Sequence, residues 1–149
     1  MKREVANAFG KVFLTIEYEP QNNLTCNTWQ GYLTLDSIMN AANIGLEMLA
    51  VTKCPHLLNN NTHVTGPWDH AVAWIAQDWT PRAIDLGLTH FAHVVDAKSF
   101  AALSAEAMVS GVAGLFEMRI FGNVADARQW LHEARQQGRL SRTAFFLKQ

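Results

Sequence analysis

Two kinds of apolar spacing alternate along this chain, and their order constrains the fold more than any other feature. Between residues 12 and 19, apolar side chains recur at every second position, as in a strand; a polar turn follows at 20–23, and residues 24–33, rich in Thr and aromatic residues, supply a second strand. From residue 34 onward, apolar side chains recur every three or four residues in four helix-like segments, with short apolar segments between them. The order is therefore a pair of strands, followed by helices and strands in alternation.

This order predicts an α/β domain with a mixed sheet. The first two strands most simply pair as a hairpin, and the later strands are expected to run parallel through right-handed crossovers. We expect about five strands and about four helices, with the helices packed mainly on one face. The expected strands are 12–19, 24–33, 57–58, 91–95 and 115–121, and the expected helices are 34–53, 67–79, 99–108 and 123–138.

Local signals place several helix ends. Thr34 is a typical cap residue, and Asn123 with Asp126 resembles a capping box at the start of the last helix. Gly138 is expected to end that helix, so we assign residues 1–138 to one domain and 139–149 to a C-terminal tail. Gly45 lies on the buried face of the first helix. Because glycine costs ~1 kcal/mol there relative to alanine, we expect a close approach of that helix to the sheet.

Charge and cysteine content exclude several classes of protein. The formal net charge is −1 and no run of Lys and Arg forms a basic stripe, so nucleic acid is not an expected partner. No window approaches the ~18 uninterrupted apolar residues of a membrane span, and the N-terminus does not read as a signal peptide. Cys26 and Cys54 stand far apart, which suggests neither a disulfide framework nor a zinc site. We expect a cytoplasmic protein with reduced thiols.

Six histidines raise the question of a metal or catalytic site, and their spacing argues against one. On a strand, His90 and His93 would point to opposite faces, while His63 and His70 do not form an i, i+4 pair. The sequence contains no His-Glu-x-x-His motif, no Gly-x-Ser-x-Gly elbow and no phosphate-binding loop. Cys54 ends a helix, where the dipole disfavours a thiolate. We therefore expect no metal, no cofactor and no catalytic residue.

Three tryptophans lie close together in the second expected helix. Trp68 and Trp79 share its apolar stripe and favour packing, whereas Trp74 falls off the stripe and is the stronger candidate for contact with a ligand or partner. The preceding segment, 59–68, is expected to be mainly loop and to present polar groups. The candidate binding residues are Asn60, Asn61, Thr62, Thr65, Trp68 and Trp74.

The C-terminal part of the chain carries a family resemblance. Residues 119–131 read as a strand, a phenylalanine, a capped turn and a helix with Ala-x-x-Trp-Leu, and 28–31 read Thr-Trp-Gln-Gly before the first helix. These segments and the strand order resemble the bacterial STAS-like family related to anti-sigma-factor antagonists. The resemblance implies a role in binding proteins or small ligands. Regulatory members carry an Asp-Ser-type phosphorylation motif after the central strand, and 59–68 lacks it, with Thr62 and Thr65 as its only hydroxyls.

These observations predict a non-catalytic module that binds a protein partner or a small apolar ligand, and they leave room for a homodimer. Two alternatives stay open. A small histidine-dependent enzyme would bring two or more of His63, His70, His90 and His93 together with a carboxylate or metal. A carrier of a hydrophobic ligand would hold a cavity between sheet and helices, lined by residues such as Phe91, Met108 and Phe116.

Overall fold

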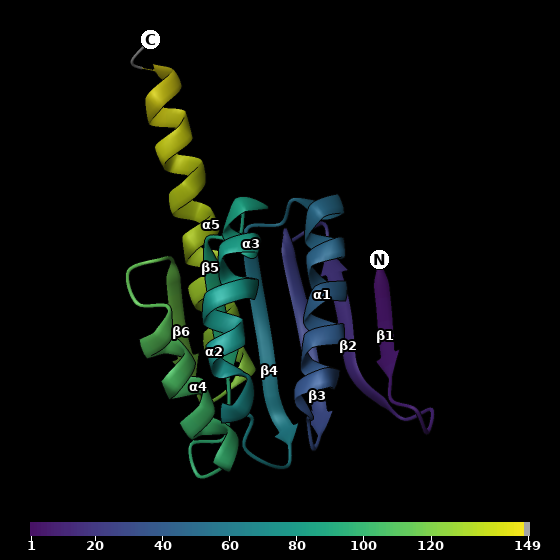
Figure 1. Cartoon of the computed structure of the whole chain (residues 1–149). Coiled ribbons are helices and arrows are strands. Elements are labelled where there is room, and N and C mark those ends of the chain that lie inside the picture. The colour runs from purple at the N-terminus through teal and green to yellow at the C-terminus, as the bar shows by residue number, and fades with distance from the viewer. Residues whose placement is uncertain (148–149) are drawn as a thin grey trace.

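A six-stranded mixed sheet with helices on both faces forms the protein (Figure 1). The computed structural model describes residues 1–147, apart from the side chains of Phe145 and Phe146. Strands follow one another across the sheet in chain order: β1 (Lys2–Ala6), β2 (Val12–Glu19), β3 (Leu24–Gly31), β4 (His56–Val64), β5 (His90–Val94) and β6 (Glu117–Phe121). The first three pair antiparallel and the last four pair parallel. The predicted α/β class and mixed sheet are confirmed.

Four helical segments cover the sheet. One layer holds α1 (Leu35–Thr52), a continuous helical stretch from 69 to 85, and α4 (Phe100–Gly111), while α5 (Val124–Leu147) packs on the opposite face. The stretch from 69 to 85 comprises η1 (Asp69–Ala71), α2 (Val72–Trp74), the π-helical η2 (Ile75–Trp79) and α3 (Thr80–Asp85). The larger hydrophobic core therefore lies between the sheet and the layer of α1, the 69–85 stretch and α4. A smaller hydrophobic core lies between the sheet and α5.

The predicted caps are present. The Thr34 side chain accepts from the backbone N–H of Ser37 at the start of α1, and Lys53 ends that helix in the left-handed conformation. The Asn123 side chain likewise accepts from the Asp126 N–H at 2.8 Å. Cap residues satisfy backbone N–H groups that have no partner within the helix, which explains why short-range sequence signals locate these ends well.

Strand β4 corrects the expected loop. Residues 59–64 continue the strand begun at His56, although three consecutive asparagines favour turns. The reason is tertiary: β4 is hydrogen-bonded to a parallel strand on each side, β3 and β5, so its backbone groups are satisfied in extended form. The polar side chains at 59–61 therefore lie on the sheet rather than in a loop.

One predicted helix end was wrong, and one strand was not predicted. The helix α5 does not end at Gly138 but continues to Leu147, and Gly138 is not among the residues with positive φ. The edge strand β1 was not expected because its sequence, Lys-Arg-Glu-Val-Ala, is mostly charged and buries only Val5. Backbone pairing with β2 holds it in place. None of the helices in the described chain, residues 1–147, is both long and apolar enough to cross a membrane.

The contact of α5 with the sheet gives a test of the smaller core. Leu131 is 2% exposed and packs with Leu58 and Ala92, whereas Leu140, on the same helix, is 62% exposed. We predict that Leu131→Ala lowers the free energy of unfolding in urea by about 2–5 kcal/mol. Leu140→Ala, the matched control, should change it by less than ~0.5 kcal/mol. Equal effects of the two substitutions would show that α5 is not docked as described.

Candidate functional site

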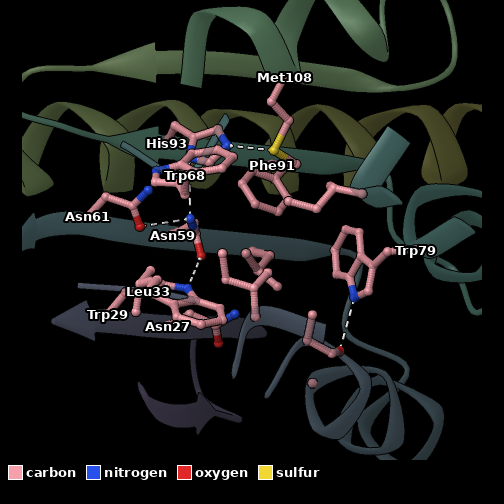
Figure 2. A pocket seen from close by; sticks show the side chains of 15 residues that line it. Asn27, Trp29, Leu33, Asn59, Asn61, Trp68, Trp79, Phe91, His93 and Met108 are labelled. Carbon is pink, nitrogen blue, oxygen red and sulfur yellow. Dashed lines mark hydrogen bonds between the residues drawn. The ribbon is translucent and has the colours of Figure 1, made fainter. Parts of the chain in front are cut away.

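A cavity lies between the sheet and the layer formed by α1, the 69–85 helical stretch and α4 (Figure 2). Its volume is about 60 Å³. Most of its lining is apolar or aromatic and buried, and the polar part comes from the sheet. The lining residues are Asn27, Trp29, Leu33, Ile38, Ala42, Gly45, Leu57, Asn59, Asn61, Trp68, Ile75, Trp79, Phe91, His93 and Met108.

A polar row crosses the floor of this cavity. Asn27 on β3 is the register partner of Asn59 on β4, and Asn59 is the register partner of His93 on β5. The three side chains are 7%, 7% and 1% exposed. Three polar side chains thus stand side by side on adjacent strands, surrounded by an apolar core. Burying such groups is costly unless they are hydrogen-bonded, so their partners decide what the row can do.

The Asn59 amide connects most of the row. Its Oδ1 accepts from Trp29 Nε1 at 2.8 Å, and its Nδ2 lies 3.2 Å from both Asn61 Oδ1 and His93 Nδ1 (Figure 2). Both N–H groups and the oxygen of this amide are therefore in use. Because Asn59 Nδ2 can only donate, the Nδ1 atom of His93 must accept.

His93 is consequently a neutral imidazole with its proton on Nε2. That nitrogen lies 3.3 Å from the Met108 sulfur, a weak acceptor. Complete burial lowers the pKa of His93 to about 3, because no charged partner compensates the loss of water. The ring stacks on Trp68 with centroids 5.8 Å apart and lies 4.6 Å from the Phe91 ring. His93 therefore acts as an uncharged polar wall of the cavity.

Two polar atoms of the lining have no hydrogen-bond partner among the described residues. They are the Oδ1 of Asn27 and the Nε1 of Trp68, an acceptor and a donor. Trp68 is 3% exposed, so its indole N–H does not reach bulk water. Leaving a buried donor or acceptor unsatisfied costs about 1–3 kcal/mol. Because both residues line the same cavity, a ligand there can supply the missing bonds.

The wall formed by α1 contains the lining residues that are most accessible to solvent. Ala42 and Gly45, both on α1, are the half-buried members of the lining, and the remaining thirteen are buried. A Cβ placed on Gly45 would meet nothing within 4 Å. The expected close approach of α1 to the sheet at Gly45 was therefore wrong, because the missing side chain leaves space rather than allowing contact.

A hydrogen bond joins the two helical elements beside this wall. The Nε1 of Trp79 donates to the backbone oxygen of Ala42 at 3.0 Å, and the Trp79 ring meets Phe91 edge-on at 6.0 Å. Trp79 belongs to the π-helical turn of η2, in which the Thr80 N–H bonds to the Ile75 oxygen. Such π-helical turns are rare in proteins overall, but those that occur are often found at functional sites. Here the turn presents Ile75 and Trp79 to the cavity.

The structure brings two of the six candidate binding residues to this cavity, Asn61 and Trp68. Asn60 is half-buried, does not line the cavity and accepts from Thr62 through its Oδ1. Thr62 and Thr65 are exposed and also lie outside the lining. Trp74 is half-buried against the larger core rather than freely exposed. These four remain candidates for a different contact.

The central histidines do not converge. Of His63, His70, His90 and His93, the cavity lining includes one, His93. His90 lies on the opposite face of the sheet, against His56 and Trp130. Within residues 1–147, no three His, Cys, Asp or Glu side chains lie close enough together to hold a metal ion.

Cys54 is a buried free thiol. Its Sγ lies 3.2 Å from the backbone oxygens of Asn23 and His56. Burial raises the pKa of the Cys54 thiol, so the thiolate that a nucleophile needs is disfavoured. These contacts are those of a structural thiol.

Sequence reasoning missed most of the polar row. Asn27 and Asn59 look like ordinary polar residues until the strands are paired, and no single segment contains the row. One signal was present: Asn59 and Asn61 have the same strand parity as the apolar Leu57, which places all three on one face of a strand. Of the three residues expected to line a carrier cavity, Phe91 and Met108 do so and Phe116 does not.

The hydrogen bonds of the row give a paired prediction on stability. Asn59→Leu leaves buried partners unsatisfied on Trp29, Asn61 and His93, so it should lower the free energy of unfolding by at least about 3 kcal/mol. Asn27→Leu removes an oxygen that has no partner, so it should leave stability unchanged or raise it. Urea denaturation of both variants measures the contrast. A loss at Asn27 as large as that at Asn59 would contradict this hydrogen-bond pattern.

The buried histidines predict a pH dependence of stability. Burial lowers the pKa of His93 to about 3, and burial together with the charges of His90 and Arg135 lowers that of His56 to about 4. An unfolded histidine titrates near 6.5, so below pH 6.5 the unfolded chain binds protons that the folded chain does not. Stability should therefore fall from pH 6.5 toward pH 4, by about 1.4 kcal/mol per pH unit for each histidine.

The test compares His93→Gln with the wild type by urea denaturation between pH 6.5 and 4.5. The pKa of Glu19 is lowered to about 2 mainly by its bond to Arg128, so Glu19 adds to the fall in stability from the acidic end of this window downward, equally in the wild type and the variant. We predict that His93→Gln reduces the slope by about 1.4 kcal/mol per pH unit. An unchanged slope in His93→Gln would show that His93 is not buried as a neutral ring.

Comparisons of the chain with protein-family models, curated proteins and solved structures found no match.

Proposed function

We propose that the protein is a binding module for a small, largely apolar molecule held in the cavity between the sheet and its helices. The observation that carries this proposal is the pair of unpartnered polar atoms, Asn27 Oδ1 and Trp68 Nε1, on an otherwise aromatic and aliphatic lining. Ligand sites in proteins combine an apolar lining with a few placed polar groups in this way. A purely structural core would gain stability from pairing or removing these atoms.

Binding is supported over catalysis by the chemistry of the lining. The lining contains no carboxylate, lysine, arginine or cysteine, and its one titratable side chain is His93. A general base must exchange protons near neutral pH, whereas the low pKa of His93 keeps it neutral there. The proposal therefore assigns His93 the role of positioning Asn59 and Trp68 rather than moving protons.

The proposal also retains the STAS-like resemblance as a hypothesis about ancestry. The resemblance implies a small sheet with helices on one face, whereas α5 packs on the face opposite the other helical segments. Fold alone does not determine function, so the binding role rests on the cavity. In this proposal the ligand lies beneath the helices, and the segment 59–68 contributes through Asn61 and Trp68.

Gly45 offers a direct test because it lines the cavity and a Cβ there would meet no atom within 4 Å, so a larger side chain can be introduced at the cavity wall. Gly45→Leu should raise helix stability by roughly 1 kcal/mol and abolish binding. Gly138→Ala is the matched control. It removes an exposed glycine from the interior of α5 with a similar gain in helix propensity, far from the cavity.

The measurement is mass spectrometry of the three proteins, purified gently from the cells that naturally make the protein, under native and denaturing conditions. Wild type and Gly138→Ala should carry a small added mass that denaturation releases, and Gly45→Leu should lack it. A wild-type protein with the same mass under both conditions would contradict the proposal. So would an adduct that Gly45→Leu retains.

A further inference from the structure

We propose that the cavity selects an uncharged, ring-sized molecule that accepts a hydrogen bond from the Trp68 indole N–H and bonds to the Asn27 amide with a second polar group. This inference rests on the proposed function and specifies its ligand. Three features of the lining lead to it: the absence of charge, the fixed direction of one donor, and the size and shape of the space.

The lining selects against charge. Every ion pair among the described residues lies outside the cavity, and the surface pairs Arg82–Asp78 and Arg128–Glu19 are typical of them. A charged ligand would give up its water without meeting an opposite charge, and that loss is far larger than the gain from neutral hydrogen bonds. A neutral ligand avoids this cost and can still bond to amide, indole and imidazole groups.

The donor of Trp68 is held in a fixed direction. Its backbone N–H donates to the Oγ of Ser104 on α4 at 2.9 Å, and its ring stacks on His93 at 27° between planes. The indole is therefore held at its backbone and on its ring face, which hinders it from turning to find a partner within the protein. A donor that is oriented in advance adds affinity because the ligand does not have to order it.

The Asn27 amide is the second contact. It occupies the same row as Asn59, but the Asn59 amide is committed to three protein partners and the Asn27 oxygen has none. Rotation about its last bond lets Asn27 present either its oxygen or its NH₂ group. A ligand with both a donor and an acceptor can therefore bond to Trp68 and to Asn27 whichever way the amide faces.

Size and shape limit the ligand further. Since each buried water needs about 10–15 Å³ of such space, a cavity of about 60 Å³ offers roughly four to six atom-sized positions. Four aromatic side chains contribute to the walls, and aromatic walls favour flat rings through offset or edge contacts. They are Trp29, Trp68, Trp79 and Phe91. A five-membered heteroaromatic ring satisfies both limits.

Pyrazole and thiophene are suitable probes because both are flat five-membered rings, and pyrazole alone has a strong donor and acceptor. Each probe is titrated into ¹⁵N-labelled protein, and the indole N–H signals of the five tryptophans are followed by NMR. Pyrazole should shift the Trp68 signal downfield more than any other. Trp29 and Trp79 are internal references, because their indole groups already donate within the protein.

Affinities of the two probes distinguish the inference from the function on which it rests. Because each hydrogen bond to a buried partner adds roughly 2- to 10-fold, pyrazole should bind at least about fivefold more tightly than thiophene. Equal binding of both inside the cavity would overturn the inference and leave the proposed function standing. Binding of neither probe would contradict both.

Substitutions of Asn27 and Trp68 test whether these two residues cause the preference for pyrazole over thiophene. Asn27→Leu and Trp68→Phe should each reduce the preference for pyrazole over thiophene by roughly 2- to 10-fold. Trp74→Phe, a control outside the lining, should keep it. If Trp68→Phe does not fold, the shift of the Trp68 indole N–H signal in the wild type on addition of pyrazole still tests the inference. A pyrazole complex without a downfield shift at Trp68 would overturn the inference.

Discussion

The side-chain amide of Asn59 is the interaction on which the centre of this protein depends. It lies on the central parallel strand β4, bonds to Trp29 from β3 and His93 from β5, and also holds Asn61 on its own strand. A shift of β4 by one residue would turn Asn59 to the opposite face and leave each of these groups unpaired in an apolar core. The amide therefore specifies the register of three strands as well as the tautomer of His93.

The same network creates a space that the apolar residues do not fill. The distance between neighbouring strands sets the distance between the polar side chains of the row. Above the row, α1, η2 and α4 contribute the side chains of the opposite cavity wall. Where α1 crosses, Gly45 contributes no side chain, so the layer stays open at that point. Protein interiors are normally packed without such gaps. In the proposed function a ligand fills this gap and pairs with the unpartnered donor and acceptor of its lining.

Much of the fold was predictable because its signals are local. The hairpin of β2 and β3, the caps at Thr34 and Asn123, and the alternation of helices with strands depend on short sequence patterns. The asparagines of β4 were misread because their preference for turns is also local, while the parallel partners that hold them extended come from distant segments. The strand β1 was missed for a similar reason, since backbone pairing carries it rather than an apolar pattern.

The candidate site was less predictable than the fold. Asn61 and Trp68 were identified from their segment, but Asn27 and His93 acquire their meaning only from cross-strand register. The most direct measurement of the central claim is a crystal structure of the protein purified from its own cells. The account predicts density for a small uncharged molecule in the cavity, within hydrogen-bond distance of Trp68 Nε1. A Trp68 N–H bonded to a protein acceptor, or a cavity holding ordered water alone, would contradict it.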